Sequence, residues 1–163
     1  MNLVDIKDYE GLYSFDLNTN QVFGHKKKHY LKSALGGTGY YLICMYKTNN
    51  RKTIQLHRLV YQAHNGIIPQ NMVIDHIDRN KLNNNIENLR LSTRSQNQYN
   101  RTMTKNNKSG IKNIILTKNN TYRLQIMKDN KIMCNKTFKT LEEAIEHKKI
   151  KLQELHGEFA NID

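Results

Sequence analysis

The chain has 163 residues, with 26 Lys or Arg against 14 Asp or Glu, a formal net charge of +12 and a pI near 9.7. Charge of one sign on this scale indicates a polyanionic partner, although a solvated Lys-rich surface from an AT-rich genome is the alternative. Cys44 and Cys134 stand alone, which argues against a disulfide framework or a cysteine zinc site. No apolar run approaches the roughly 20 residues of a membrane span, and the start of the chain has no signal-peptide core.

Residues 1–66 are predicted to form a small module rich in short strands. Strands are predicted at 12–15, 21–23 and 40–46, the last of them after a glycine-rich turn at 36–39. Four apolar residues then recur at helical spacing: Leu56, Leu59, Val60 and Ala63. Gly66 and Pro69 are expected to end that helix.

The residues that point most directly to chemistry lie between 67 and 106. A predicted strand at 73–77 carries the adjacent pair Asp75 and His76, and an Asn-rich loop follows it. Aspartate supplies a hard oxygen ligand for Mg²⁺ or Mn²⁺, and a neighbouring histidine suits the role of general base at neutral pH. Because side chains alternate along a strand, the two are expected to point to opposite sides.

A second predicted strand at 89–92 leads into a helix that is capped by Ser92 or Thr93 and runs to about residue 101. Asn97 lies about one turn into that helix. If the helix packs across the hairpin, Asp75 and Asn97 can share one ion. Two protein oxygens suffice for Mg²⁺, which keeps several waters.

Asn88, at the end of the Asn-rich loop, is a candidate to orient the base. Its side chain could accept a hydrogen bond from the His76 imidazole or clamp the loop. Three other asparagines compete for this central role: Asn83, Asn84 and Asn85. The spacing favours Asn88.

Residues 107–163 are predicted to form three strands, at 111–116, 121–127 and 132–138, followed by a helix that begins after Thr140. Alternation in the middle strand places Tyr122, Leu124 and Ile126 on one face, and Arg123 and Gln125 on the other. Charge divides in the same way, because residues 107–140 carry eight basic residues and one acidic residue, whereas residues 141–163 carry three and six. One side of this module is therefore predicted to touch phosphate.

Basic and amide side chains of the sheet and of the central helix are the predicted DNA contacts: Arg123, Gln125, Lys112, Lys128, Lys136, Arg94 and Arg101.

The stretch from Ile74 to Arg90, with its spacing to Asn97, resembles the HNH nuclease family, whose core is a ββα-metal hairpin and helix. The resemblance implies that His76 is the general base, that Asp75 and Asn97 are the metal ligands, and that Asn88 is the central asparagine. It is greatest to phage and intron-encoded homing endonucleases, in which Asp precedes the base and Asn replaces the final His.

The resemblance extends over nearly the whole chain. Residues 1–66 are similar to the small module that often precedes this nuclease core, and residues 108–160 are similar to the ethylene-response-factor type of DNA-binding domain. The expected α+β fold is thus a β-rich module at 1–66, a ββα-metal core at 67–106 and a three-stranded antiparallel sheet on one helix at 107–163. The departures are Arg79 where the family often has Gly, and a C-terminal module without its usual tryptophans.

His57 is a second candidate, because it stands before a helix and is followed by Arg58, as at a recurrent position in such proteins. The alternative is a capping or buried structural histidine. The patch Lys26-Lys-Lys-His29 could likewise meet a phosphate backbone or be a solvated turn.

The resemblance implies a site-specific, Mg²⁺- or Mn²⁺-dependent endonuclease that cuts double-stranded DNA to 5′-phosphate and 3′-hydroxyl ends. With one active site per chain, a monomer is expected to nick, and a dimer would be needed for a double-strand break. We expect an intracellular protein, in a bacterial or virus-infected cell, with no membrane and no small-molecule cofactor. The alternative is a DNA-binding regulator with a decayed nuclease core.

Overall fold

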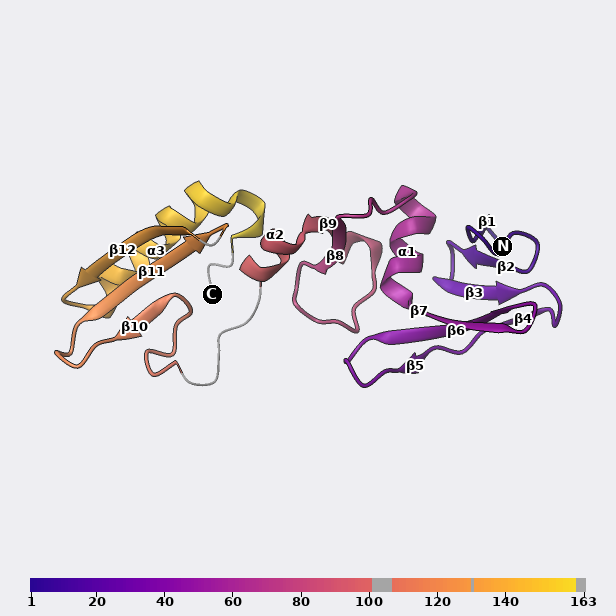
Figure 1. Cartoon of the computed structure of the whole chain (residues 1–163), viewed down its shortest axis with the longest axis horizontal. Helices are drawn as coiled ribbons and strands as arrows, with labels where there is room; N and C mark the ends of the chain where they lie inside the picture. Colours follow the sequence, from indigo (N-terminus) through magenta and orange to yellow (C-terminus); the bar gives the residue numbers. More distant parts are fainter. Residues whose placement is uncertain (101–106, 130, 161–163) are drawn as a thin grey trace. The chain divides into compact units, whose positions relative to one another are not determined.

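The computed structural model describes residues 1–100, 107–129 and 131–160 (Figure 1). It divides into two compact units, Met1–Leu91 and Ser92–Asp163, and each is described by itself. The predicted α+β class is confirmed: sheets at the N-terminal end, a ββα core and a C-terminal three-stranded sheet on a helix. Within the described residues, no helix is both long and apolar enough to cross a membrane.

Two antiparallel sheets build the N-terminal part of the first unit. The first contains, in order, β1 (Leu3–Asp5), β2 (Tyr13–Asp16), β3 (Gln21–Gly24) and β4 (His29–Tyr30). The second contains β5 (Ala34–Leu35), β6 (Tyr41–Lys47) and β7 (Asn50–Gln55). The predicted strands at 12–15, 21–23 and 40–46 correspond to β2, β3 and β6, and the shorter strands pair with them.

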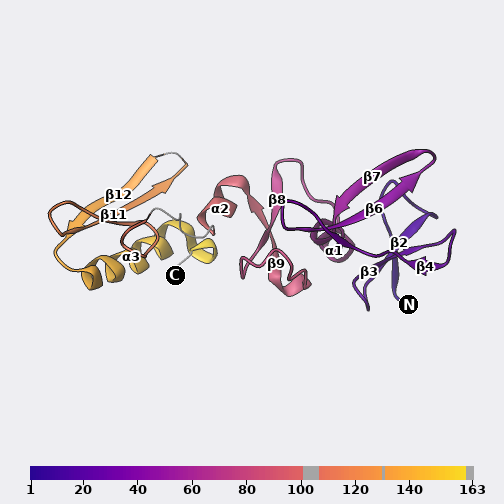
Figure 2. The ribbon, with the colours of Figure 1, turned by 90° about the horizontal axis from the view of Figure 1, so that it is seen from below.

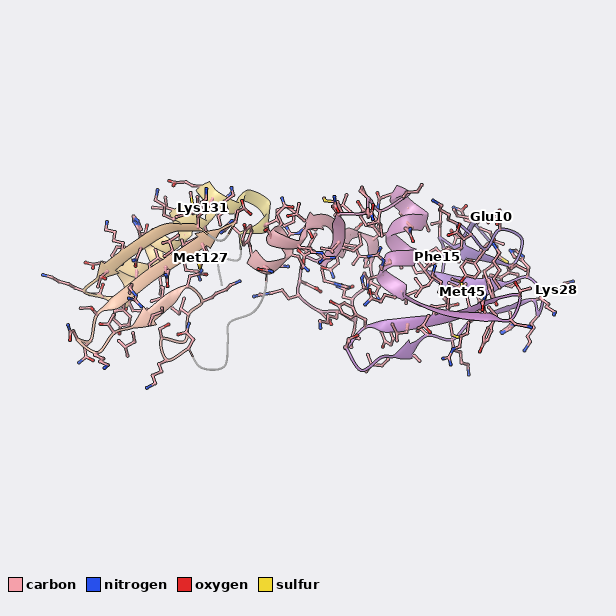
Figure 3. All side chains as sticks on the ribbon, viewed as in Figure 1. Glu10, Phe15, Lys28, Met45, Met127 and Lys131 are labelled. Carbon is pink, nitrogen blue, oxygen red and sulfur yellow. The ribbon has the colours of Figure 1, made fainter. Side chains whose placement is uncertain are left out.

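Helix α1 (Leu56–Asn65) follows β7 directly, and Gly66, with a positive φ of 84°, ends it as predicted. The four apolar residues of α1 join a core that includes Phe15 and Val22 from the first sheet and Met45 from the second. Phe15, Val22 and Met45 are fully buried, and Figure 3 shows Phe15 and Met45 inside the unit. Sheets and helix therefore share one apolar core.

The same core extends to the hairpin of β8 (Met72–His76) and β9 (Leu89–Thr93), which form a two-stranded sheet. Ile74 and Leu89 are buried in it. Between the strands lie the Asn-rich loop and a short 3₁₀ turn, η1 (Ile86–Asn88), whose N-cap is Asn85. The N-terminal sheets and the β8–β9 hairpin thus pack into one core. The module boundary near residue 66 stays a prediction.

The second unit begins with α2 (Arg94–Tyr99), where Thr93 and Gln96 form a capping box, as the sequence allowed. The helix ends at Tyr99, two residues earlier than predicted, and Arg101 lies outside the described residues. The C-terminal sheet contains β10 (Ile114–Leu116), β11 (Tyr122–Lys128) and β12 (Lys131–Phe138). The strand predicted from 111 starts only at Ile114, because a turn held by Ser109 and the positive φ of Asn113 precede it.

Helix α3 (Leu141–His156) covers one face of this sheet, and the short turn η2 (Gly157–Phe159) follows it (Figure 2). The Thr140 hydroxyl caps α3 by accepting a hydrogen bond from the Glu143 amide. Leu124 and Ile126 of β11 are fully buried against the helix, whereas Arg123 is exposed on the opposite face. The predicted alternation of the middle strand is confirmed.

Candidate functional site

The end of strand β8 carries Asp75 and His76, whose exposed fractions are only 4% and 5%. The two residues are adjacent in sequence, and both polar side chains are buried. An irregular loop follows them. Burying a carboxylate costs free energy unless a cation or hydrogen-bond donors compensate it, so the partners of Asp75 determine what it can do.

Arg90 of β9 is the cation that meets Asp75. Its Nε and Nη2 atoms both lie 2.9 Å from Asp75 Oδ2, and its side chain is 16% exposed. Arg90 is not among the residues predicted from the sequence. Leu89 and Leu91 on either side of it join the core, which by alternation turns Arg90 to the other face. That alternation is visible in the sequence, but the pairing of β9 with β8 was needed to find the partner.

The ring of His76 is held by an asparagine of the loop. His76 Nε2 lies 3.0 Å from Asn84 Oδ1. An amide oxygen only accepts hydrogen bonds, so Nε2 carries the hydrogen and Nδ1 is the basic nitrogen of the neutral imidazole. Asn84 therefore orients the candidate base. Asn84 was one of three asparagines weighed against Asn88 for the central role, and the assignment of that role to Asn88 stays a prediction.

Asn88 has the second role that was considered for it, as a clamp of the loop. Its Oδ1 accepts from the Asp78 amide at 2.9 Å, while its Nδ2 donates to Asp78 Oδ1 at 2.9 Å and to the Asn83 carbonyl at 2.8 Å. Partial burial acts to raise the pKa of Asp78. Hydrogen bonds from Asn83, the Asn80 amide and Asn88 together outweigh this and lower that pKa below its ordinary value. The loop that positions Asn84 is thus fixed by an ionised carboxylate.

Lys81 ties the same loop to the N-terminal sheets. Its ammonium donates to the Thr38 carbonyl at 3.0 Å and lies 4.6 Å from the centre of the Tyr40 ring. A cation over an aromatic face is attracted by the ring quadrupole. These contacts bring Tyr40, from the turn before β6, beside the loop of the candidate site.

His57, in the first turn of α1, lies against the candidate base. Its ring centre is 5.0 Å from that of His76 and 4.9 Å from that of Tyr40, and it is 5% exposed. Burial, with the nearby His76 and Arg58, lowers the pKa of His57 to about 3. His57 is therefore a neutral, buried imidazole at neutral pH. His57 is buried, as the interpretation of a structural histidine expects. It also contacts the ring of His76 and so lies next to the candidate site.

Asn97, the other predicted metal ligand, lies half-buried on α2 in the second unit. Its sharing of an ion with Asp75 stays a prediction. The donor set of one carboxylate and one amide oxygen suits Mg²⁺ or Mn²⁺, which take few protein ligands and several waters. Among the described residues, no three His, Cys, Asp or Glu side chains gather into a cluster that could hold a metal.

The predicted DNA contacts of the C-terminal unit fall into two groups. Arg123 and Gln125 lie on the sheet face away from α3, opposite Thr137 and Asn135 of β12. Lys112 and Lys128 instead bind within the unit, since their ammonium groups donate to the Tyr99 carbonyl at 2.6 Å and the Leu155 carbonyl at 2.8 Å. These hydrogen bonds stabilise the fold, and the DNA contacts of the two lysines stay predictions.

Two more predicted DNA contacts, Lys136 and Arg94, are exposed. Lys136 pairs in register with the buried Leu124, and its ammonium lies 5.3 Å from the centre of the Phe138 ring. Arg94 is exposed at the start of α2. Arg101 cannot be placed, because it lies outside the described residues.

Comparison with known proteins identifies the family. A family model described as HNH endonuclease matches residues 55–99, which run from β7 through α1 and the β8–β9 hairpin to the end of α2. The chain is also 39% identical over 100 residues to the DNA endonuclease I-HmuI of Bacillus phage SP01, covering 61% of this chain and 57% of that protein. This chain belongs to the HNH endonuclease family.

Further relatives extend this assignment. An HNH endonuclease of Acanthamoeba polyphaga mimivirus is 40% identical over 108 residues, which are 66% of this chain and 56% of that protein. Protein 3.8 of Escherichia phage T7 is 36% identical over 112 residues, which are 68% of this chain and 92% of that protein. The sequence matches thus span a little over half the length of I-HmuI and of the mimivirus protein.

The fold is shared as well. A solved structure that reports DNA binding and cleavage by the HNH homing endonuclease I-HmuI matches with a TM-score of 0.57 and 29% identity. The match covers 90% of this chain and 83% of that chain, so it includes both units. HNH nucleases typically use a divalent metal, which agrees with the hard oxygen donors of Asp75 and Asn97.

Proposed function

We propose that this chain is a site-specific, Mg²⁺- or Mn²⁺-dependent DNA endonuclease of the homing type. It hydrolyses a phosphodiester of double-stranded DNA to a 5′-phosphate and a 3′-hydroxyl. The observation that carries the proposal is the adjacent buried pair Asp75 and His76 at the end of β8, within a matched HNH motif. A carboxylate ligand and an oriented base are the groups that metal-assisted phosphodiester hydrolysis requires.

The chain's own residues would act as follows. His76 accepts a proton from the attacking water at Nδ1, because Asn84 holds Nε2. His57 stays neutral beside it, so no second imidazolium repels the proton that His76 takes up. Asp75 and Asn97 would hold the divalent ion, which when bound polarises the scissile phosphate and stabilises the departing 3′ oxygen. Asn88 keeps the loop that carries Asn84 in place.

The C-terminal sheet would hold DNA at a distance from the cut. Its face away from α3 presents Arg123 and Gln125, while the acidic side chains of α3 lie on the other side of the unit. Two linked modules on one duplex raise each other's effective concentration, so a long site can be recognised through modest contacts. One active site per chain implies nicking by a monomer.

The first test is strand-resolved cleavage of DNA that spans the gene's own insertion locus without the insert. Mg²⁺, Mn²⁺ and EDTA are compared, and a gel shift is run on the same DNA. Cuts at a fixed position that require the metal are expected, on one strand for a monomer. Tight binding without cleavage in either metal would instead support the DNA-binding regulator.

The sheet's role makes a separate prediction for Arg123→Gln. Each phosphate contact contributes about 0.9 to the slope of log affinity against log salt concentration, so this slope should fall by about 0.9 if Arg123 binds phosphate. The matched control is Lys149→Gln, which removes the same charge from the exposed part of α3. Fluorescence anisotropy over a salt series checks both variants, and equal slopes would contradict the assigned DNA face.

A further inference from the structure

We propose that Arg90 makes binding of the divalent ion depend on bound DNA. Arg90 cancels the charge of Asp75, so the free protein holds the ion weakly, and a DNA phosphate supplies the negative charge that is missing. This inference rests on the proposed function, in which Asp75 is a metal ligand. It adds a regulatory role for a residue outside the predicted site.

The contact between Arg90 and Asp75 is close and shielded. Both Nε and Nη2 meet the same oxygen, Oδ2, at 2.9 Å, and the carboxylate is 4% exposed. A pair this shielded from solvent is screened by salt much less than a surface pair. The carboxylate therefore presents little net charge to an ion that approaches it.

The rest of the motif does not restore that charge. Residues 74–90 contain three carboxylates and, with Arg90, three cationic side chains, so their formal net charge is zero with His76 neutral. Asp78 is the next carboxylate along the chain from Asp75. Its Oδ1 accepts from the Asn80 amide and from Asn88, and its Oδ2 accepts from Asn83 at 2.7 Å. Asp78 is thus committed to holding the loop.

Arg90 offsets the charge of Asp75, which is the only charged group among the two predicted metal ligands. The other predicted ligand, Asn97, is a neutral amide, and the described residues contain no cluster of three His, Cys, Asp or Glu that could act as a cage. Mg²⁺ characteristically completes its coordination with substrate phosphates. Even in bulk water, a unit charge at salt-bridge distance changes the binding of a divalent ion by roughly tenfold or more.

A DNA phosphodiester brings one negative charge and two non-bridging oxygens. It offsets the charge of Arg90 and adds a hard ligand at the same moment. Because coupling between two ligands is reciprocal, the ion should strengthen DNA binding by the same factor by which DNA strengthens ion binding. The free enzyme would then remain largely without metal until it is on DNA.

Mn²⁺ binding, followed by the electron paramagnetic resonance signal of the free ion, tests this directly. The full chain carries His76→Ala to prevent cleavage, and Mn²⁺ is titrated with and without a short duplex at low salt, after subtraction of binding by the duplex alone. We expect the affinity for Mn²⁺ to rise at least about tenfold on DNA. Equal affinities with and without DNA would overturn the proposal.

Variants of Arg90 test the cause. Arg90→Gln should raise the Mn²⁺ affinity of the DNA-free protein by at least about tenfold. Arg90→Lys, the matched control, keeps the charge and should stay within about threefold of the wild type. Absence of a gain in Arg90→Gln, or an equal gain in Arg90→Lys, would show that charge is not the cause and would overturn the proposal. If Arg90→Gln does not fold, the comparison of the His76→Ala chain with and without DNA decides.

Asp75→Asn in the Arg90→Gln background separates this inference from the proposed function. The gain in Mn²⁺ affinity should disappear, because the carboxylate that binds the ion is gone. A gain that persists would place the ion elsewhere and would contradict both the ligand role of Asp75 and the inference. Since Mn²⁺ binding is measured without cleavage, a protein that shows the coupling but never cuts DNA would contradict only the proposed function.

Discussion

Replacing His76 by alanine should reduce the rate of DNA cleavage by about 10²–10⁴-fold, the usual contribution of a general base. DNA affinity should stay close to that of the wild type, because His76 is buried and is not a proposed DNA contact. Single-turnover cleavage with Mg²⁺ measures the rate, and a gel shift in EDTA measures affinity. A rate within about threefold of the wild type would show that His76 is not the base.

Two further variants make this result specific. Asn84→Ala should reduce the rate less than His76→Ala, since it removes the partner that orients the ring but leaves the base in place. His64→Ala, at an exposed position in the last turn of α1, should leave cleavage unchanged. If His64→Ala reduced the cleavage rate as much as His76→Ala, the loss would reflect misfolding of the first unit and not removal of the general base.

The second large effect is expected on stability and involves His57. Its pKa is lowered to about 3 in the folded protein, whereas an unfolded chain has a histidine pKa near 6.5. Between these values the unfolded state binds a proton that the folded state does not. Stability due to neutral His57 is therefore complete above pH 6.5 and is lost as pH falls, by about 2 kcal/mol between pH 7 and pH 5.

Urea unfolding at a series of pH values measures this loss. His57→Gln, which cannot titrate, should flatten the fall in the free energy of unfolding between pH 7 and pH 5. His64→Gln is the matched control, because it removes an exposed histidine from the same helix and should keep the wild-type dependence. Identical pH dependence in His57→Gln and the wild type would contradict a buried neutral His57.

Local patterns in the sequence determined the main secondary-structure elements and the residue types of the candidate site. The period-2 alternation of the middle C-terminal strand correctly divided Leu124 and Ile126 from Arg123, because a half-buried sheet imposes that period. The Asp75-His76 pair was found because metal-assisted hydrolysis needs those groups together, and the HNH resemblance was confirmed by the family match to residues 55–99. Caps at Thr93 and Thr140 were also readable, since they act within one helical turn.

Only the tertiary structure decided which side chains meet. Arg90 reaches Asp75 because β9 pairs with β8, and His57 reaches His76 because α1 packs in the same core as the hairpin. Within the loop, the hydrogen bonds of Asn88 to Asp78 and Asn83 left Asn84 as the partner of the base. The hydrogen bonds of Lys112 and Lys128 to backbone carbonyl groups were likewise visible only in the folded unit.

The physical reason is the range over which each effect acts. Strand alternation, helix caps and motif spacing are set by covalent neighbours, so a sequence displays them. The charge that Asp75 offers an ion and the ionisation of His57 depend on residues brought close by folding, and on burial, which is a property of the whole core. The sequence therefore determined the kind of chemistry, and the packing of α1, the loop and the β8–β9 hairpin decided how its groups are held and charged.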